Sequence, residues 1–147
     1  MNDTRPPPAA PAPMRVLLLD DDAFMLEVLA EMLDQLGEFD VVAAAHAAAA
    51  LAALRLHRPR LLICDLSLPE MDGIEFLRLA AEAGFDGGVV LLSGMHVAVR
   101  KAAERLAEAH GLRLLGAYKK PMERTDLLHM VALQQRADLA AGRTVPA

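Results

Sequence analysis

Five polar residues follow apolar runs of the chain and could perform chemistry together. They are Asp20 and Asp21 after the run at 16–19, Asp65 after 61–64, Ser93 after 89–92, and Lys120 after a short run at 112–115. Carboxylates gathered at one place repel each other and require a cation, and hard oxygen ligands favour Mg²⁺. A metal, a lysine and a hydroxyl beside an aspartate suit a phosphoryl group, with the aspartate attacking phosphorus in line.

These apolar runs alternate with helical patterns. We expect strands at 16–19, 39–45, 61–65, 89–92 and 112–115, and helices at 25–36, up to 56, at 73–83, 97–110 and 125–136. Gly37 and Gly111 stand where the first and fourth helices should stop. The strands are apolar throughout, which is typical of a parallel sheet buried on both faces. The pattern therefore predicts an α/β fold, a doubly wound sandwich of five strands and five helices.

The topology of such a sheet would bring the polar residues together. Parallel strands joined by right-handed crossovers all end at the same edge of the sheet, and ligands bind outside that edge. We therefore expect the two neighbouring aspartates, Asp65, Ser93 and Lys120 on one edge. Asp22, the next acidic residue, is expected to cap the first helix.

Composition limits the classes of function. The 147 residues fit one domain, placed at 14–136 between a Pro- and Ala-rich tail at 1–13 and a C-terminal tail at 137–147. A net charge of −5 argues against direct binding to nucleic acid, and no apolar stretch is long enough to cross a membrane. Cys64, the single cysteine, lies in an apolar run and is expected to be a buried, inert thiol. We expect a cytoplasmic protein.

Four segments of the sequence resemble the receiver domain of bacterial two-component response regulators. They are Val-Leu-Leu-Leu-Asp-Asp-Asp at 16–22, Leu-Leu-Ile-Cys-Asp-Leu-Ser-Leu-Pro-Glu-Met-Asp-Gly at 61–73, Leu-Leu-Ser at 91–93 and Lys-Lys-Pro at 119–121. Each segment alone is a weak signal, but their order and spacing match the family over 14–136. The resemblance implies the CheY-like, flavodoxin-like (βα)5 fold, with a parallel sheet in the strand order 2-1-3-4-5.

The resemblance also implies a role for each site residue. Asp65 would be the aspartate that accepts the phosphoryl group. The magnesium site would be made by Asp20, Asp21, Asp65 and the backbone carbonyl of Ser67, with Asp21 coordinating directly and Asp20 acting mostly through a metal-bound water. The hydroxyl of Ser93 would bond a phosphoryl oxygen. Lys120, aimed inward by a cis peptide bond to Pro121, would pair with the phosphate.

By the same resemblance, the function is signalling. A histidine kinase or a phosphotransfer protein would donate the phosphoryl group, and a downstream protein or output domain would respond. The chemistry of the chain would be confined to its own phosphorylation and slow self-hydrolysis, so we do not expect an enzyme acting on other substrates. We expect the phosphorylation-responsive surface, and a possible homodimer, on the face built from the helix at 97–110, the strand at 112–115 and the helix at 125–136.

The sequence departs from the family at Ala117. Receivers usually carry an aromatic residue three positions before the conserved lysine, and here Tyr118 is displaced by one step, which in a strand reverses the face. The small residue, together with Leu-Ser-Gly-Met at 92–95 and Gly-Leu-Arg-Leu-Leu-Gly at 111–116, is similar to receivers attached to cyclic-di-GMP phosphodiesterase (EAL) modules. A stand-alone regulator and a receiver excised from such a longer protein are both compatible with the sequence.

A protein of another class remains as the alternative. Small phosphohydrolases of the haloacid-dehalogenase-like fold also form an aspartyl-phosphate, on an Asp-x-Asp motif after the first strand, where this chain has three consecutive aspartates. Such enzymes carry a substrate-covering insertion that is not recognisable here, and Asp65 is a better acceptor. The pair Asp72 and Gly73 is interpreted as a turn and the start of a helix.

Overall fold

Strands and helices alternate along the chain as the sequence predicts. The computed structural model describes residues 13–67, 73–94 and 97–143, so the predicted tail at 1–13 lies outside it except for Pro13. The elements in chain order are β1 (Met14–Leu19), α1 (Ala23–Leu36), β2 (Phe39–Ala44), α2 (Ala47–His57), β3 (Leu61–Asp65), α3 (Gly73–Glu82), β4 (Gly88–Ser93), α4 (Val97–Ala109), β5 (Arg113–Lys119) and α5 (Arg124–Ala140). No helix within these described ranges combines the length and hydrophobicity needed to span a bilayer.

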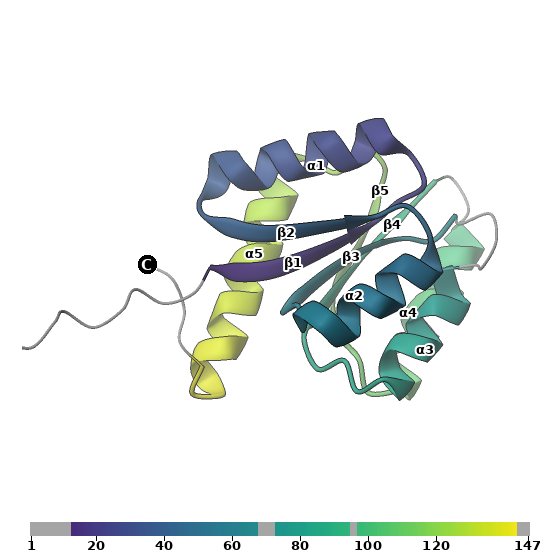
Figure 1. Ribbon diagram of the computed structural model, residues 1–147. Helices are drawn as coiled ribbons and strands as arrows, with labels where there is room; N and C mark the ends of the chain where they lie inside the picture. Colours follow the sequence, from purple (N-terminus) through teal and green to yellow (C-terminus); the bar gives the residue numbers. More distant parts are fainter. Residues whose placement is uncertain (1–12, 68–72, 95–96, 144–147) are drawn as a thin grey trace, which may run out of the picture.

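The strands form one parallel sheet in the order β2-β1-β3-β4-β5, which confirms the predicted order. Figure 1 shows α1 and α5 on one face of the sheet and α2, α3 and α4 on the other. The two faces carry separate apolar clusters. Along β3, for example, Leu62 and Cys64 join the cluster under α2, α3 and α4, whereas Leu61 and Ile63 join the cluster under α1 and α5. A strand covered on both faces requires apolar residues at every position, which explains the continuous runs in the sequence.

Helix termini follow the local signals. Asp22 caps α1, since its Oδ1 accepts hydrogen bonds from the N–H groups of Phe24 at 3.0 Å and Met25 at 3.4 Å. Gly37 ends the same helix, with its N–H donating to the carbonyl of Leu33 at 3.2 Å. The capping prediction for Asp22 is therefore confirmed. The cap also fixes the point at which the chain, after leaving β1, begins α1.

Two elements extend beyond their predicted ends. β5 runs to Lys119 rather than stopping at 115, and it is an edge strand whose half-buried residues do not form a continuous apolar run. Gly116 interrupts the apolar pattern because a Cβ there would lie 2.8 Å from the ring of Tyr118 and 3.2 Å from the sulfur of Met130. α5 continues to Ala140, so the predicted tail at 137–147 begins too early. The periodicity weakens there because the buried residue of the last turn is the charged Asp138.

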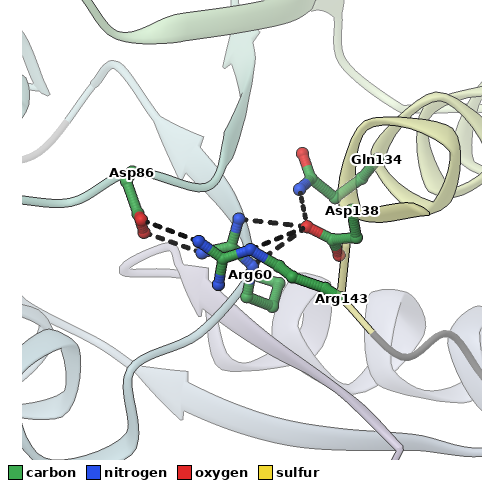
Figure 2. A network of polar contacts seen from close by, with 5 residues as sticks. All are labelled: Arg60, Asp86, Gln134, Asp138 and Arg143. Atoms are coloured by element: carbon green, nitrogen blue, oxygen red, sulfur yellow. Dashed lines mark hydrogen bonds and ion pairs between the residues drawn. The ribbon is translucent and has the colours of Figure 1, made fainter. Parts of the chain in front are cut away.

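A polar network holds the end of α5 against the start of the central strands (Figure 2). The Arg60 guanidinium donates to Asp138 Oδ1 through Nη2 at 3.0 Å and Nε at 3.1 Å, and to Asp86 Oδ1 through Nη1 at 2.7 Å. Gln134 Nε2 donates to the same oxygen of Asp138 at 2.9 Å, and Arg143 Nη2 donates to Asp86 Oδ2 at 3.0 Å. The side chain of Asp138 is only 6% exposed, so its negative charge is stabilised by these partners rather than by water.

Asp138→Ala is expected to lower the free energy of unfolding by about 2–4 kcal/mol, because the partly buried Arg60 guanidinium loses two of its hydrogen bonds and the buried Gln134 amide loses its acceptor. Asp86→Ala is the matched control, since its side chain is 68% exposed, and its loss should cost about 0–1 kcal/mol. Urea denaturation followed by circular dichroism measures both. Equal losses for the two variants would contradict the structural role assigned to Asp138.

Candidate functional site

Three carboxylates converge at the carboxyl edge of the sheet. Asp20 follows β1 and Asp65 ends β3, and these strands are hydrogen-bonded neighbours. Carboxylate oxygens of Asp20, Asp21 and Asp65 all lie within 4.8 Å of one another. Asp20 and Asp65 are each 1% exposed, while Asp21 is exposed to solvent. The prediction that the strand ends bring these acids together is therefore confirmed.

Lys120 faces the two buried carboxylates. Its Nζ lies 3.1 Å from Asp20 Oδ2 and 2.9 Å from Asp65 Oδ2. The loop that carries it is tied to the end of β4, because its backbone N–H donates to the carbonyl of Ser93 at 2.9 Å. The peptide bond between Lys120 and Pro121 is cis, as the resemblance implied.

The other carboxylate oxygens accept backbone hydrogen bonds. Asp20 Oδ1 accepts from the N–H of Asp22 at 2.9 Å, and Asp65 Oδ1 accepts from the N–H of Ser67 at 3.0 Å. Each buried carboxylate thus has one oxygen held by the backbone and one facing Lys120. This arrangement fixes the orientation of both groups.

Burial and charge act in opposite directions on the ionisation of the site. Burial, with the charge of Asp65 acting in the same sense, raises the pKa of Asp20 above its ordinary value despite hydrogen bonds from Asp22 and Lys120. Burial also penalises the ammonium of Lys120, but its contacts with Asp65 and Asp20 outweigh that penalty and raise the pKa of the lysine. Lys120 therefore remains a fixed cation at neutral pH.

The charge balance and the ligand types fit a divalent cation. Three carboxylates against one ammonium leave two uncompensated negative charges at one place. All the donor atoms are hard oxygens, and the cluster contains neither a histidine nor a thiol, which favours Mg²⁺ over zinc or copper. Asp21 provides the solvent-exposed side through which an ion could enter.

The remaining predicted residues lie around this cluster. Ser93 ends β4, is 4% exposed, and follows Leu92, the residue that pairs with Asp65 across the sheet. Ser67 lies two residues beyond Asp65 with an exposed side chain. Asp72, interpreted from the sequence as a turn residue, lies outside the described residues.

Gly73 has a role that the sequence analysis missed. A Cβ at this position would lie 2.6 Å from the Cα of Leu66 and 2.9 Å from the carbonyl oxygen of Asp65. The start of α3 therefore packs directly on the backbone that carries Asp65, and only glycine permits that approach. The Asp-Gly pair was interpreted as local turn chemistry, and nothing local in it indicates a contact with a residue eight positions earlier.

Cys64, next to Asp65, matches its predicted inert role. It is fully buried, and burial, together with the charges of Asp65 and Asp20, raises the pKa of its thiol far above the ordinary value. A thiolate is the reactive form of cysteine, so this side chain contributes packing rather than chemistry.

Ala117 and Tyr118 face opposite sides of the sheet, as predicted. Ala117 packs against the cluster under α2, α3 and α4, whereas Tyr118 packs against the cluster under α1 and α5. The Tyr118 hydroxyl contacts the sulfur of Met130 on α5 at 3.6 Å. Tyr118 therefore does not take the place of an aromatic residue at position 117.

Comparison with known proteins agrees with this geometry. The family model for the response regulator receiver domain matches residues 16–132. The cyclic di-GMP phosphodiesterase RocR of Pseudomonas aeruginosa is 33% identical over 129 residues, which is 86% of this chain and 33% of that protein. The chemotaxis protein CheY of Bacillus subtilis is 35% identical over 82 residues, 55% of this chain and 68% of CheY. The similarity to RocR agrees with the resemblance to receivers attached to cyclic-di-GMP phosphodiesterase modules.

Solved structures give the same result. A response regulator from Colwellia psychrerythraea superposes with a TM-score of 0.72 at 32% identity, covering 85% of this chain and 99% of that one. A CheY-like receiver domain from Methanospirillum hungatei superposes with a TM-score of 0.77 at 24% identity, covering 89% of this chain and 100% of that one. With the strand order, the acidic cluster and the family model in agreement, the chain belongs to the response regulator receiver domain family.

Proposed function

We propose that this chain accepts a phosphoryl group on Asp65 from a phosphohistidine of a kinase or phosphotransfer protein, with Mg²⁺ bound, and passes the change to a downstream protein or output domain. The observation that supports this most directly is the contact of Lys120 Nζ with two buried carboxylates at 2.9 and 3.1 Å. A lysine held there can pair with a phosphoryl oxygen as soon as one arrives.

Asp65 is oriented for attack. Its Oδ1 accepts from the N–H of Ser67 and its Oδ2 lies beside Lys120, so neither oxygen rotates freely. In the proposed step, a carboxylate oxygen forms a bond to phosphorus while the bond from phosphorus to the histidine nitrogen of the donor breaks. The histidine leaves with the electron pair of that bond, and Asp65 becomes an acyl phosphate. Water later attacks phosphorus, the bond from phosphorus to the Asp65 oxygen breaks, and inorganic phosphate leaves as the carboxylate is restored.

The proposed magnesium ligands are the carboxylates of Asp20, Asp21 and Asp65 and the backbone carbonyl of Ser67. Bound Mg²⁺ would neutralise phosphoryl oxygens as negative charge moves between donor and acceptor. Ser93, buried at the end of β4 next to β3, would bond a phosphoryl oxygen once Asp65 is modified.

The proposed chemistry is confined to the chain's own aspartate. RocR and CheY differ in what they do as whole proteins, and this chain spans 33% of RocR. We therefore assign the response to phosphorylation to a separate segment or protein. The proposed responding surface is made by α4, β5 and α5, and a homodimer would use it. α4 buries only Ala103 and Ala107 among its described residues, and such small side chains let a helix shift at low cost.

We expect incubation with acetyl phosphate and Mg²⁺ to add one phosphoryl group, detected by intact-mass spectrometry. Asp65→Asn should abolish the adduct, because the amide lacks the nucleophilic oxygen. Lys120→Met should slow formation of the adduct by about 10²-fold, since the fixed positive charge that stabilises the transferred phosphoryl group is lost. Asp22→Asn is the matched control, because asparagine preserves the helix cap and the change removes a neighbouring charge outside the cluster.

An unlabelled wild type, or equal labelling of Asp65→Asn, would refute the assignment of Asp65. Sustained hydrolysis of many small phosphate esters would instead indicate the alternative phosphohydrolase.

Removal of divalent metal with EDTA should stop labelling by acetyl phosphate, and added Mg²⁺ should restore it. Asp21→Asn should require a Mg²⁺ concentration about tenfold higher for half-maximal labelling, because one ligand charge is lost. Asp40→Asn, an exposed aspartate that pairs with Arg15 away from the cluster, serves as the control and should leave the Mg²⁺ requirement unchanged. Labelling that continues without metal would exclude the proposed magnesium site.

Tyr118 should not report phosphorylation. The chain has one tyrosine and no tryptophan, so its intrinsic fluorescence comes from Tyr118, which packs on the face away from Ala117. Beryllofluoride with Mg²⁺, a mimic of the phosphoryl group, is expected to leave this emission unchanged, because the proposed shift of α4 takes place on the other face of the sheet. The comparison variant combines Tyr118→Phe with Ala117→Tyr, which moves the fluorophore to the other face, where its emission should respond. A clear response from Tyr118 in the wild type would contradict this assignment.

A further inference from the structure

A cationic cavity lies at the edge of the sheet opposite the acidic cluster. It has a volume of about 510 Å³ and lies between the carboxyl ends of α2 and α3 and the segments that enter β3 and β4. Its charged lining, among the described residues, consists of Arg55, Arg58, Arg60, Arg143 and Asp86. Four positive charges against one negative charge make this a local exception in a chain of net charge −5.

Two of the four arginines are held in place before any ligand arrives. Arg60 is fixed by Asp138 and Asp86, and Arg143 donates to Asp86 at 3.0 Å (Figure 2). Although partial burial acts in the opposite sense, the hydrogen bonds and charges of Arg60 and Arg143 lower the pKa of Asp86. The carboxylate therefore stays ionised and keeps both guanidinium groups at the cavity.

The other two arginines have no such partner. Within the described residues, the side chains of Arg55 and Arg58 form neither an ion pair nor a hydrogen bond. Cations are favoured in the last turn of a helix, where they can interact with the free carbonyl groups. At the end of α2, however, the carbonyl of His57 already accepts a hydrogen bond from Arg15 Nη1 at 2.8 Å. Arg58 also adopts a left-handed backbone, with φ 48° and ψ 61°, where glycine or asparagine would cost less. Helix capping therefore does not account for an arginine at this position.

Part of the cavity lining is apolar. Leu54 and Pro59 are buried and Phe85 is half-buried, and all three line the cavity. The volume lies in the range of about 300–1,000 Å³ typical of small-molecule sites. A ligand that matches both the arginines and the apolar residues of the lining has a flat apolar body joined to more than one anionic group.

We propose that this cavity binds a nucleoside diphosphate, with the base against Leu54, Pro59 and Phe85 and the phosphates on Arg55 and Arg58. Guanidinium groups pair with phosphate oxygens through two parallel hydrogen bonds, so two unpaired arginines suit two phosphates. Arg143 lies at the same cavity and adds to the positive field.

The test is calorimetric titration of the full chain with ADP in a buffer containing EDTA, which removes any metal from the acidic cluster. ADP is expected to bind with a dissociation constant below the millimolar range. Adenosine, which lacks the phosphates, and pyrophosphate, which lacks the base, should each bind at least about tenfold more weakly. Arg55→Gln and Arg58→Gln should each weaken ADP binding by about tenfold. The control Arg124→Gln removes an exposed arginine from the opposite edge and should change nothing.

Arg58→Gly separates a binding defect from a folding defect. Glycine relieves the left-handed backbone, so the melting temperature should rise while ADP binding weakens. Asp65→Asn should bind ADP like the wild type, which keeps this test independent of phosphorylation. Absence of ADP binding at millimolar concentration, affinity unchanged by either glutamine variant, or equal affinity for pyrophosphate would each overturn the proposal.

Discussion

The burial of two like charges at the end of neighbouring strands is the constraint around which this domain is organised. Asp20 and Asp65 are almost inaccessible to solvent and belong to hydrogen-bonded strands, so their repulsion is not screened by water. Lys120 offsets it from the end of β5, and the hydrogen bond from its backbone to Ser93 attaches that loop to β4. The sheet order matters because it brings the ends of β1, β3 and β4 close enough for one ammonium to serve both carboxylates.

The central strands and the acidic cluster were predictable from sequence because their signals are local. A strand buried on both faces must be apolar throughout, and a polar residue that ends it is conspicuous. The edge strand β5 was predicted too short, because a strand paired on one side tolerates Gly116 and polar positions. The end of α5 was missed because the main ionic partner of the buried Asp138 is Arg60, which lies 78 positions away in the sequence. Contacts between residues so far apart leave no periodic trace.

The acidic cluster also limits how stable the domain can be. In the unfolded chain Asp20 and Asp65 are separated and hydrated, whereas the native state brings them together out of water. A cation that binds only the native cluster would raise stability in proportion to its occupancy. The edge that carries the proposed chemistry thus has unfavourable electrostatics of its own, in line with the usual trade-off between activity and stability.

Gly73 has a consequence for how this protein tolerates mutation. Its Cα lies against the backbone of Asp65 and Leu66, in a space that no side chain can share. Even alanine would push α3 away from the strand that carries Asp65, although Gly73 has no group that could take part in chemistry. In a library of random substitutions, position 73 would therefore appear as intolerant as the aspartate itself. Intolerance at that position would mark a packing contact rather than a reactive group.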